Sequence, residues 1–365
     1  MKLDRGNRVG WLERISFGRL SLNRLSRDVG IDLGTANTLV FVTNSEDILD
    51  EPSVVAIDKN TQEVLAIGQQ AKAMLGRTPE NIVALRPLRD GVIADFESAE
   101  LMLQQFIRKA LNGRSLFRPR IAIGIPSGVT GVERRAVMEA ASQAGAREVF
   151  LLDEPIAAAI GAGLPVDEPV GSMLVDVGGG TTEVAVLSLQ GTVLSESVRV
   201  AGNELSEAIA QYMKKVHNLV VGERTAEDIK IQVGSAYPSE ANDAAQMQVR
   251  GLHLFSGLPR NVTLKGPEIR ESMSEPLAAI VEAVKRTLER TPPELSADII
   301  NRGIALTGGG ALLSGLDELI AHETGIETYV AEDPLRCVVR GTSQVLGRFD
   351  EQNLARLFSE RSSAR

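Results

Sequence analysis

Two stretches of the 365-residue chain follow the same plan: VGIDLGTANTLVF at 29–41 and MLVDVGGGTTEVAV at 173–186. In each, an apolar run ends on an aspartate, a glycine-rich turn follows, and a second apolar run begins. A third stretch, IALTGGGALL at 304–313, ends an apolar run on three glycines. The repetition predicts a duplicated domain that holds a ligand between its copies. Two unrelated hairpins with glycine turns are the plainer alternative.

The rest of the chain alternates short apolar runs, rich in β-branched residues, with longer Ala- and Leu-rich segments. This alternation is typical of an α/β fold. Strands are predicted at 29–33, 39–43, 121–125, 173–177, 184–187 and 304–307. Helices are predicted at 99–111, 132–143, 205–216 and 274–289, and the last has its apolar residues at the spacing of one helix face.

Composition limits the class of protein. With 43% hydrophobic and 24% charged residues, the chain reads as globular, and its length allows two or three domain-sized cores. The net charge of −9 is unevenly distributed, because residues 1–27 carry +5 together with the sole tryptophan, Trp11. The remaining chain carries −14, which argues against nucleic-acid binding, since that requires a basic face.

Several other classes are disfavoured. The single cysteine, Cys337, cannot form an internal disulfide, so a reducing cytoplasm is expected. The three histidines are scattered, which argues against a His/Cys metal site and Cys–His catalysis. No apolar run approaches the roughly 18 residues of a membrane span, and the tail lacks the features of a cleaved signal peptide.

Phosphate binding is the chemistry that the glycine-rich turns favour. Without a Cβ, a turn can bring its backbone N–H groups close to an anion. Asp32 and Asp176 are expected at strand ends beside the two turns, and such carboxylates suit hydrated Mg²⁺. Neither the P-loop pattern nor the G-x-G-x-x-G pattern occurs, so a P-loop NTPase and a dinucleotide-binding fold are disfavoured. Further hydrogen-bond donors at the turns are Thr35, Asn37, Thr38, Thr181 and Thr182.

IDLGTANT (31–38), VDVGGGTTE (175–183) and LTGGGALL (306–313) resemble the two phosphate motifs and the adenosine motif of the actin, sugar-kinase and heat-shock-chaperone ATPase superfamily. Within it, the chain is similar to the MreB group of bacterial actins from about residue 28 to about residue 348. That likeness rests on EPSVVAID (51–58), ALRPLRDGVIADF (84–96), DEPIAAAIGAGLPV (153–166), ERTAEDIK (223–230), TPPELSADI (291–299) and AEDPL (331–335).

The resemblance implies an actin-like α/β fold, in which duplicated ribonuclease-H-like domains form four subdomains around a nucleotide cleft. A basic amphipathic tail would occupy 1–27. The first half would span 28–168, with a small subdomain at about 56–88, and the second 169–333, with one at about 205–268. Residues 334–350 would return to the first half, and 351–365 would form a polar tail.

The resemblance also implies an ATP site with Mg²⁺ and slow hydrolysis tied to polymerisation. Glu154 would position the attacking water together with Thr181, and Asp32 and Asp176 would hold Mg²⁺ through water. The nucleotide-binding residues would be Gly34, Thr35, Ala36 and Asn37; Gly178, Gly179, Gly180 and Thr181; Glu227, Asp228, Ile229 and Lys230; and Gly308, Gly309, Gly310, Ala311 and Leu312.

Each of these side chains has a structural alternative. Glu154 before Pro155 is a common start of a helix, Lys230 could be a solvated helix residue, and Thr181 could satisfy only turn backbone. The chain also departs from the family pattern, with Asn203 and Ser206 where aspartate is common, which removes two charges near the cleft.

Two segments indicate membrane binding. In the tail, Trp11, Leu12 and Ile15 share one side of a helical projection that basic residues surround, as in an interfacial helix on anionic lipid. Leu116 and Phe117, in the arginine-rich stretch 112–120, resemble the membrane-insertion loop of the family. A disordered basic leader is the alternative for the tail, and packing against a neighbouring strand is the alternative for Leu116 and Phe117.

The expected function is therefore a membrane-associated cytoskeletal ATPase that determines rod shape by organising cell-wall synthesis. Its expected partners are further copies, in head-to-tail protofilaments paired antiparallel, the anionic inner face of the cell membrane, and cell-wall elongation proteins. A sugar kinase needs an aspartate base, and residues 121–150 contain none. A chaperone needs a substrate domain, for which the chain after about residue 348 is too short.

Overall fold

The computed structural model describes residues 27–43, 45, 47–112, 118–347 and 358–363. The membrane residues expected from the sequence, Trp11, Leu12, Ile15, Leu116 and Phe117, lie outside this part of the chain. None of the helices within the described ranges has both the length and the apolar character needed to cross a bilayer.

The first half is built on a six-stranded sheet with the order β19-β10-β9-β1-β2-β3. Helices α2 and α3 cover one face, where they bury Phe106 and Val137 with strand residues such as Ile31 and Ile123. The elements are β1 (Val29–Leu33), β2 (Asn37–Val42), β3 (Ile48–Pro52), α2 (Phe96–Leu111), β9 (Arg120–Ile125), α3 (Gly131–Gln143), β10 (Glu148–Asp153) and β19 (Phe358–Ser363).

The second half repeats this plan with a five-stranded sheet of order β13-β12-β11-β17-β18. Its outer face packs on α9, where Val175, Val184 and Leu306 share a buried cluster with Ile280 and Val284. The elements are β11 (Ser172–Val177), β12 (Thr182–Ser188), β13 (Gly191–Val198), α9 (Ser274–Arg290), α10 (Pro293–Arg302), β17 (Ile304–Thr307), η3 (Gly309–Leu312), α11 (Leu316–Thr324), β18 (Thr328–Val330) and η4 (Pro334–Arg336).

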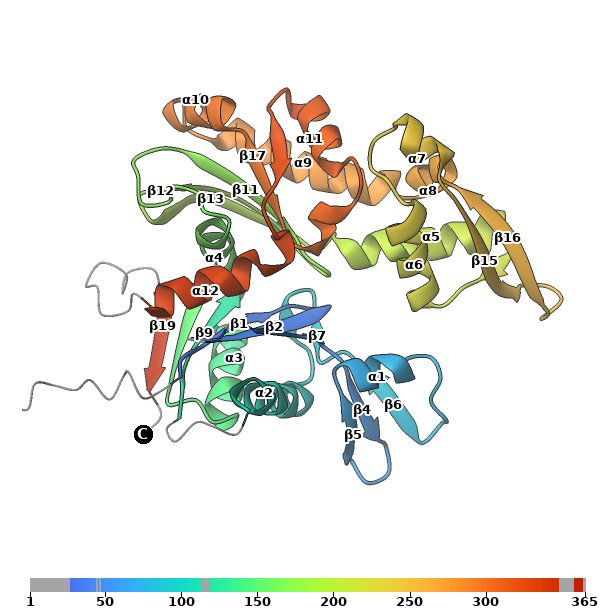
Figure 1. The fold of residues 1–365 in the computed structure, drawn as a ribbon, viewed down its shortest axis with the longest axis horizontal. Coiled ribbons are helices and arrows are strands. Elements are labelled where there is room, and N and C mark those ends of the chain that lie inside the picture. Colours follow the sequence, from blue (N-terminus) through green and yellow to red (C-terminus); the bar gives the residue numbers. More distant parts are fainter. Residues whose placement is uncertain (1–26, 44, 46, 113–117, 348–357, 364–365) are drawn as a thin grey trace, which may run out of the picture.

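Each half carries a smaller unit at the same side of the molecule (Figure 1). In the first half it holds β4 (Val55–Asp58), β5 (Val64–Ile67), α1 (Gln69–Met74) and β6 (Ile82–Leu85), followed by the hairpin β7 (Leu88–Arg89) and β8 (Val92–Ile93). In the second half it holds α5 (Gly202–Val216), β14 (Leu219–Val220), α6 (Glu223–Val233), α7 (Glu240–Ala244), β15 (Gln246–His253), β16 (Pro259–Lys265) and α8 (Gly266–Ser272).

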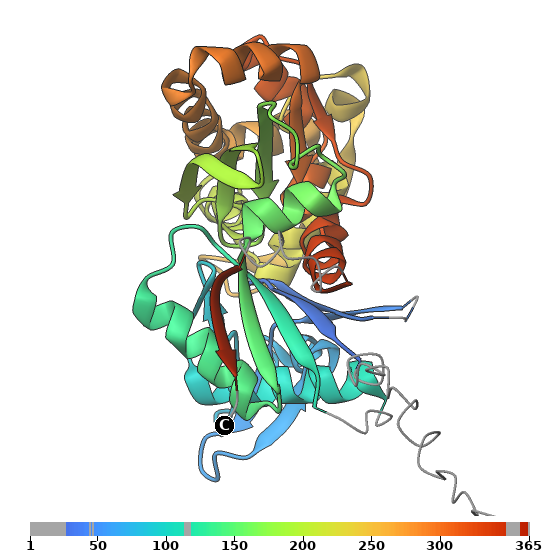
Figure 2. The ribbon, with the colours of Figure 1, turned by 90° about the vertical axis from the view of Figure 1, so that its left-hand side faces the viewer.

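Two helices join the halves: α4 (Glu154–Gly161) and α12 (Cys337–Gly347). Figure 2 shows the green α4 and the red α12 between the two sheets. The helices approach backbone to backbone, because a Cβ at Gly341 would lie 1.8 Å from the carbonyl oxygen of Ala157, and one at Gly161 would lie 1.8 Å from that of Cys337. Glycine at both positions is therefore what allows this close crossing.

The duplication predicted from the two aspartate-glycine stretches is confirmed by strand register. In the first sheet Asp32 on β1 pairs with Leu39 on β2, and in the second Asp176 on β11 pairs with Glu183 on β12. The predicted strands and helices are also present, with small shifts at their ends. Helix α2, for example, begins at Phe96 rather than at residue 99, because Asp95 caps it by accepting a hydrogen bond from the Ser98 backbone N–H.

Candidate functional site

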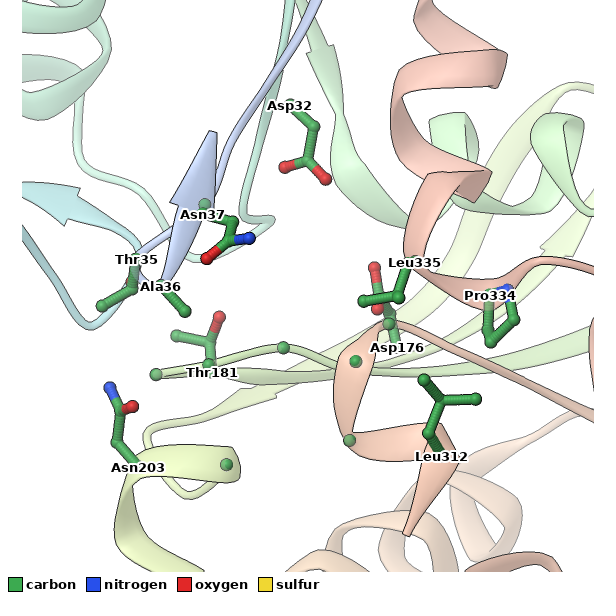
Figure 3. Close-up of a pocket in the computed structure, with 18 of the residues that line it drawn as sticks. Asp32, Thr35, Ala36, Asn37, Asp176, Thr181, Asn203, Leu312, Pro334 and Leu335 are labelled. Atoms are coloured by element: carbon green, nitrogen blue, oxygen red, sulfur yellow. The ribbon is translucent and has the colours of Figure 1, made fainter. Parts of the chain in front are cut away.

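A pocket of about 490 Å³ lies where the two halves meet, and elements of both halves line it. The turn after β1 and the turn after β11 enter it from opposite sides, and the 3₁₀ segment η3 closes a third side (Figure 3). The three glycine-rich stretches of the sequence therefore come together at one place, at the ends of β1, β11 and β17.

The turns from the two halves touch each other. A Cβ at Gly179 would lie 2.7 Å from the Cβ of Ala36, and one at Gly180 would lie 3.1 Å from the Thr35 hydroxyl oxygen. That hydroxyl oxygen accepts a hydrogen bond of 3.0 Å from the Gly91 backbone N–H. Glycine at 179 and 180 allows this approach to the side chains of Ala36 and Thr35, and the approach presents two sets of backbone N–H groups to one space. Such a space suits a chain of phosphates.

The third glycine stretch packs against the end of β11. Gly308 has φ +80°, and a Cβ there would lie 2.3 Å from the Asp176 carboxylate and 2.4 Å from the Val177 carbonyl oxygen. Beyond it, the side chains of Leu312, Pro334 and Leu335 form an apolar wall of the pocket (Figure 3). An apolar wall beside polar turns is typical of a small-molecule site and suits a flat aromatic base.

Helix α6 contributes the polar side of this region. Lys230 Nζ donates a hydrogen bond of 2.7 Å to the Gly202 carbonyl oxygen and lies 3.6 Å from Glu227 Oε2. Burial lowers the pKa of Lys230, and Glu227 partly offsets this. Ser206 Oγ lies 3.1 Å from the same carbonyl oxygen and 3.5 Å from Glu227 Oε2. A cation and two acceptors are thus held together at one end of the pocket.

Two aspartates, the partly buried Asp32 and the buried Asp176, face the pocket from opposite halves. The carboxylates of Asp32 and Asp176 point into the same space (Figure 3). Burial, followed by repulsion from Asp176 and Asp50, raises the pKa of Asp32 to about 8. Burial and then Glu183 raise the pKa of Asp176 to about 7.

Such a pair of carboxylates fits a divalent cation, whose charge would stabilise both ionised forms. Among the described residues there is no group of three or more potential ligands of the His, Cys, Asp or Glu type. Asp32 and Asp176 would therefore hold Mg²⁺ together with water and phosphate oxygens, as Mg²⁺ prefers.

Glu154 enters the pocket at the start of α4, directly after β10. Asp153 precedes it and Pro155 follows, so the helix starts where the strand ends. Burial raises the pKa of Glu154 well above its ordinary value, and Asp32 and then Glu183 add to the shift. A carboxylate with a raised pKa is better able to accept a proton near neutral pH. Thr181, from the second turn, lines the same pocket.

The structure brings most of the expected site residues together. The pocket is lined by Asp32, Gly34, Thr35, Ala36, Asn37, Glu154, Asp176, Gly178, Gly179, Gly180, Thr181, Glu227, Lys230, Gly308, Gly309, Gly310 and Leu312. Three expected residues do not line it. Ile229 and Ala311 are 0% and 2% exposed within the core, and Asp228 lies on another face of α6. A helix presents residues three and four apart on one face, so Glu227, Lys230 and Ile231 face the pocket instead.

Other lining residues were not expected from the sequence. Lys72 comes from α1 in the small unit, and Asp50, which accepts a hydrogen bond of 2.7 Å from the Asn37 amide, comes from β3. No local sequence signal marks either of them. Pro334 and Leu335 lie within AEDPL, a block that had pointed to the family but not to the site.

Matched sheets, two glycine-rich turns and an aspartate from each half at a shared pocket define the actin-like class of protein. The solved MamK double helical filament is similar in fold, with a TM-score of 0.74 and 21% identity over 88% of this chain and 99% of that chain. The chain belongs to the MreB/Mbl family, because the family model described as MreB/Mbl protein matches residues 26–354.

Individual relatives agree with this assignment. Cell shape-determining protein MreB of Escherichia coli (strain K12) is 54% identical over 341 residues, which cover 92% of this chain and 97% of the relative. Cell shape-determining protein Mbl of Bacillus subtilis (strain 168) is 51% identical over 327 residues, covering 89% and 97%. The crystal structure of MreB 5 of Spiroplasma citri bound to AMPPNP is 35% identical with a TM-score of 0.85, covering 91% and 98%. The relatives and the fold support a cytoskeletal role in cell shape.

Proposed function

We propose that this protein is an ATP-dependent cytoskeletal protein that polymerises at the membrane and determines rod shape by organising cell-wall synthesis. The observation that carries the proposal is the meeting of two glycine-rich turns, the aspartates Asp32 and Asp176, and Glu154 at one pocket. MreB 5 of Spiroplasma citri, which has the same fold, has been solved with AMPPNP and with ADP.

In this proposal the phosphates of ATP lie between the turns 34–37 and 178–181, and the base lies against Leu312, Pro334 and Leu335. Glu227 and Lys230 would contact the ribose and the base. Mg²⁺ at Asp32 and Asp176 would neutralise phosphate charge during phosphoryl transfer. The mutual repulsion of the two carboxylates gives the pocket an affinity for a cation that one carboxylate alone would not provide.

Hydrolysis would depend mainly on positioning, because phosphoryl transfer to water needs little covalent chemistry from the protein. Glu154 would accept a hydrogen bond from the attacking water and orient it along the line of the breaking P–O bond. Thr181 would hold the same water from the other half. Glu154 and Thr181 belong to different halves, so the position of the water depends on how closely the two halves approach each other. If contacts between subunits fix that approach, hydrolysis would be slow in the monomer and faster in the filament.

Assembly would be head to tail, a heterologous contact that does not close on itself, with protofilaments paired antiparallel. The relative MamK forms a double helical filament. The tail at 1–27, with its charge of +5 and Trp11, and the segment with Leu116 and Phe117 would bind the anionic inner face of the cell membrane. One weak anchor per subunit becomes strong when a filament repeats it, and wall-elongation proteins would join it there.

Glu154→Ala tests the enzymatic part of the proposal. We expect it to bind ATP with an affinity within a few-fold of the parental protein, while phosphate release falls by about 10²-fold or more, the usual contribution of a positioned acid or base. Glu139→Ala, on an exposed face of α3, is the control and should behave like the parent. Phosphate release at the parental rate by Glu154→Ala would show that the role of Glu154 is wrong.

A further inference from the structure

A row of polar side chains crosses the second sheet close to the pocket. Glu183 on β12 pairs directly with Asp176 on β11 and, on its other side, with Ser197 on β13. Residues paired directly across strands point to the same face of a sheet. The side chain of Glu183 therefore shares a face with that of Asp176, the candidate Mg²⁺ residue.

That face is the one that α4 covers. Leu174 and Ala185, which alternate in phase with Asp176 and Glu183, belong to a buried cluster with Ile156 and Ala157 of α4. Glu154 is the first residue of α4. Glu183 thus lies behind the pocket, on the side from which the candidate catalytic carboxylate enters.

Glu183 is buried and bridges the two halves. Glu183 is 1% exposed and does not line the pocket, so we expect no contact between its side chain and a nucleotide bound there. One carboxylate oxygen, Oε2, accepts a hydrogen bond of 3.4 Å from the backbone N–H of Ser127, which follows β9 in the first half. The other oxygen, Oε1, is buried without a hydrogen-bond partner among the described residues.

Such an arrangement is costly, because a buried carboxylate that is incompletely hydrogen-bonded loses hydration free energy that its contacts do not return. Accordingly, burial raises the pKa of Glu183. Hydrogen bonding from Ser197 and Ser127 opposes this shift, and the negative charge of Asp153 adds to it. A buried polar group of this kind requires an explanation.

The duplicated half shows that the fold itself does not need this carboxylate. Asp32 pairs with Leu39 in the same register in which Asp176 pairs with Glu183. Leu39 is 4% exposed, so the equivalent position is also buried, and leucine fills it there. The second half therefore carries a carboxylate at a position where the first half carries an apolar side chain. The carboxylate lies on the side from which Glu154 enters the pocket.

We propose that Glu183 is a positioning residue for hydrolysis. Its hydrogen bond holds the Ser127 loop of the first half against the sheet that carries Asp176, and this contact fixes the position of Glu154. The inference rests on the proposed ATPase function. Glu183 acts through Glu154 and not on the substrate, so its loss is expected to change turnover and to leave nucleotide affinity in place.

Three variants test the proposal. Glu183→Leu copies the first half and removes the hydrogen bond. Glu183→Gln keeps an oxygen that can accept it. Glu196→Gln removes the same charge from the neighbouring strand β13, where Glu196 pairs with Arg286 on the opposite face, and serves as the matched control.

The readouts are the affinity for a fluorescent ADP analogue and phosphate release at saturating ATP and Mg²⁺. We expect all three variants to bind within about twofold of the parent. We expect turnover to fall at least tenfold in Glu183→Leu, to stay within about threefold in Glu183→Gln, and to be unchanged in Glu196→Gln. If the leucine variant does not unfold cooperatively, Glu183→Met, which is unbranched and of similar length, replaces it.

Parental turnover in the leucine or methionine variant would overturn the proposal, and so would a parallel loss of affinity and turnover, which indicates a purely structural role. Equal losses in the leucine and glutamine variants would contradict the role of the Glu183 hydrogen bond. If the parental protein itself releases no phosphate with ATP, it is the proposed ATPase function that fails.

Discussion

The contact between α4 and α12 offers a sharp test, because a single methyl group should disturb it. In Gly341→Ala the new Cβ would lie 1.8 Å from the Ala157 carbonyl oxygen, 2.6 Å from its carbonyl carbon and 2.9 Å from its Cα. All three are backbone atoms of a helix, so no side-chain rotation relieves the overlap. Since Cβ atoms essentially never approach other atoms closer than 3.0 Å, the helices must separate by at least about 1 Å.

Two consequences follow from this separation. Overpacking of this kind typically costs about 1–3 kcal/mol of the free energy of unfolding, and the backbone contact places this variant near the upper end. Helix α4 begins with Glu154, so a shift of about 1 Å also moves the candidate catalytic carboxylate. Displacements of that size can cost about 10²-fold in rate.

The assay combines urea unfolding with phosphate release at saturating ATP. Gly347→Ala is the control on the same helix, because a Cβ there meets nothing within 4 Å. It should be neutral or slightly stabilising, since alanine is the better helix former. If Gly341→Ala unfolds within about 0.5 kcal/mol of the parent and hydrolyses ATP at the parental rate, the close helix crossing does not set the geometry of the site.

Three further predictions concern pH, the third glycine stretch and the tail. Because burial raises the pKa of Asp32 to about 8 and that of Asp176 to about 7, the folded apo protein binds more protons than the unfolded chain between about pH 4 and pH 8. The free energy of unfolding in EDTA should therefore fall as pH rises through this range, by at most about 1.4 kcal/mol per pH unit for each aspartate. Urea titrations that show greater stability at pH 8 than at pH 6 would contradict this. Gly308→Ala, which forces a side chain against Asp176 at a positive φ, should weaken ATP binding at least about tenfold. Calorimetry measures the affinity, and an unchanged value would refute the prediction. A chain of residues 28–365 should lose most of its co-sedimentation with anionic liposomes under polymerising conditions, and unchanged sedimentation would remove the tail from the membrane account.

Much of the site was predictable because its determinants are local. An aspartate at the end of an apolar run, followed by a glycine-rich turn, specifies both a strand end and a phosphate-sized turn, and the second copy doubles the signal. The contact between Gly179 and Ala36 could not be foreseen, because the glycines predicted a close approach of each turn to an anion and not of one turn to the other.

The residues that the sequence misplaced or missed depend on three-dimensional context. Treating 227–230 and 308–312 as contiguous contact runs ignored which face each segment presents, so Ile229 and Ala311 were expected at a site from which they are turned away. Lys72 reaches the pocket from another unit, a long-range arrangement without a local motif. Glu183 had a signal that went unused: it breaks the match between the copies, where Leu39 stands in the first.

Electron microscopy of the full-length protein on anionic liposomes, with ATP and Mg²⁺ and without nucleotide, tests the central claim most directly. The account predicts paired filaments lying on the membrane with ATP and few or none without nucleotide. Absence of filaments across nucleotides and lipid compositions, from protein that binds ATP and is monodisperse, would contradict a cytoskeletal function for this pocket and fold.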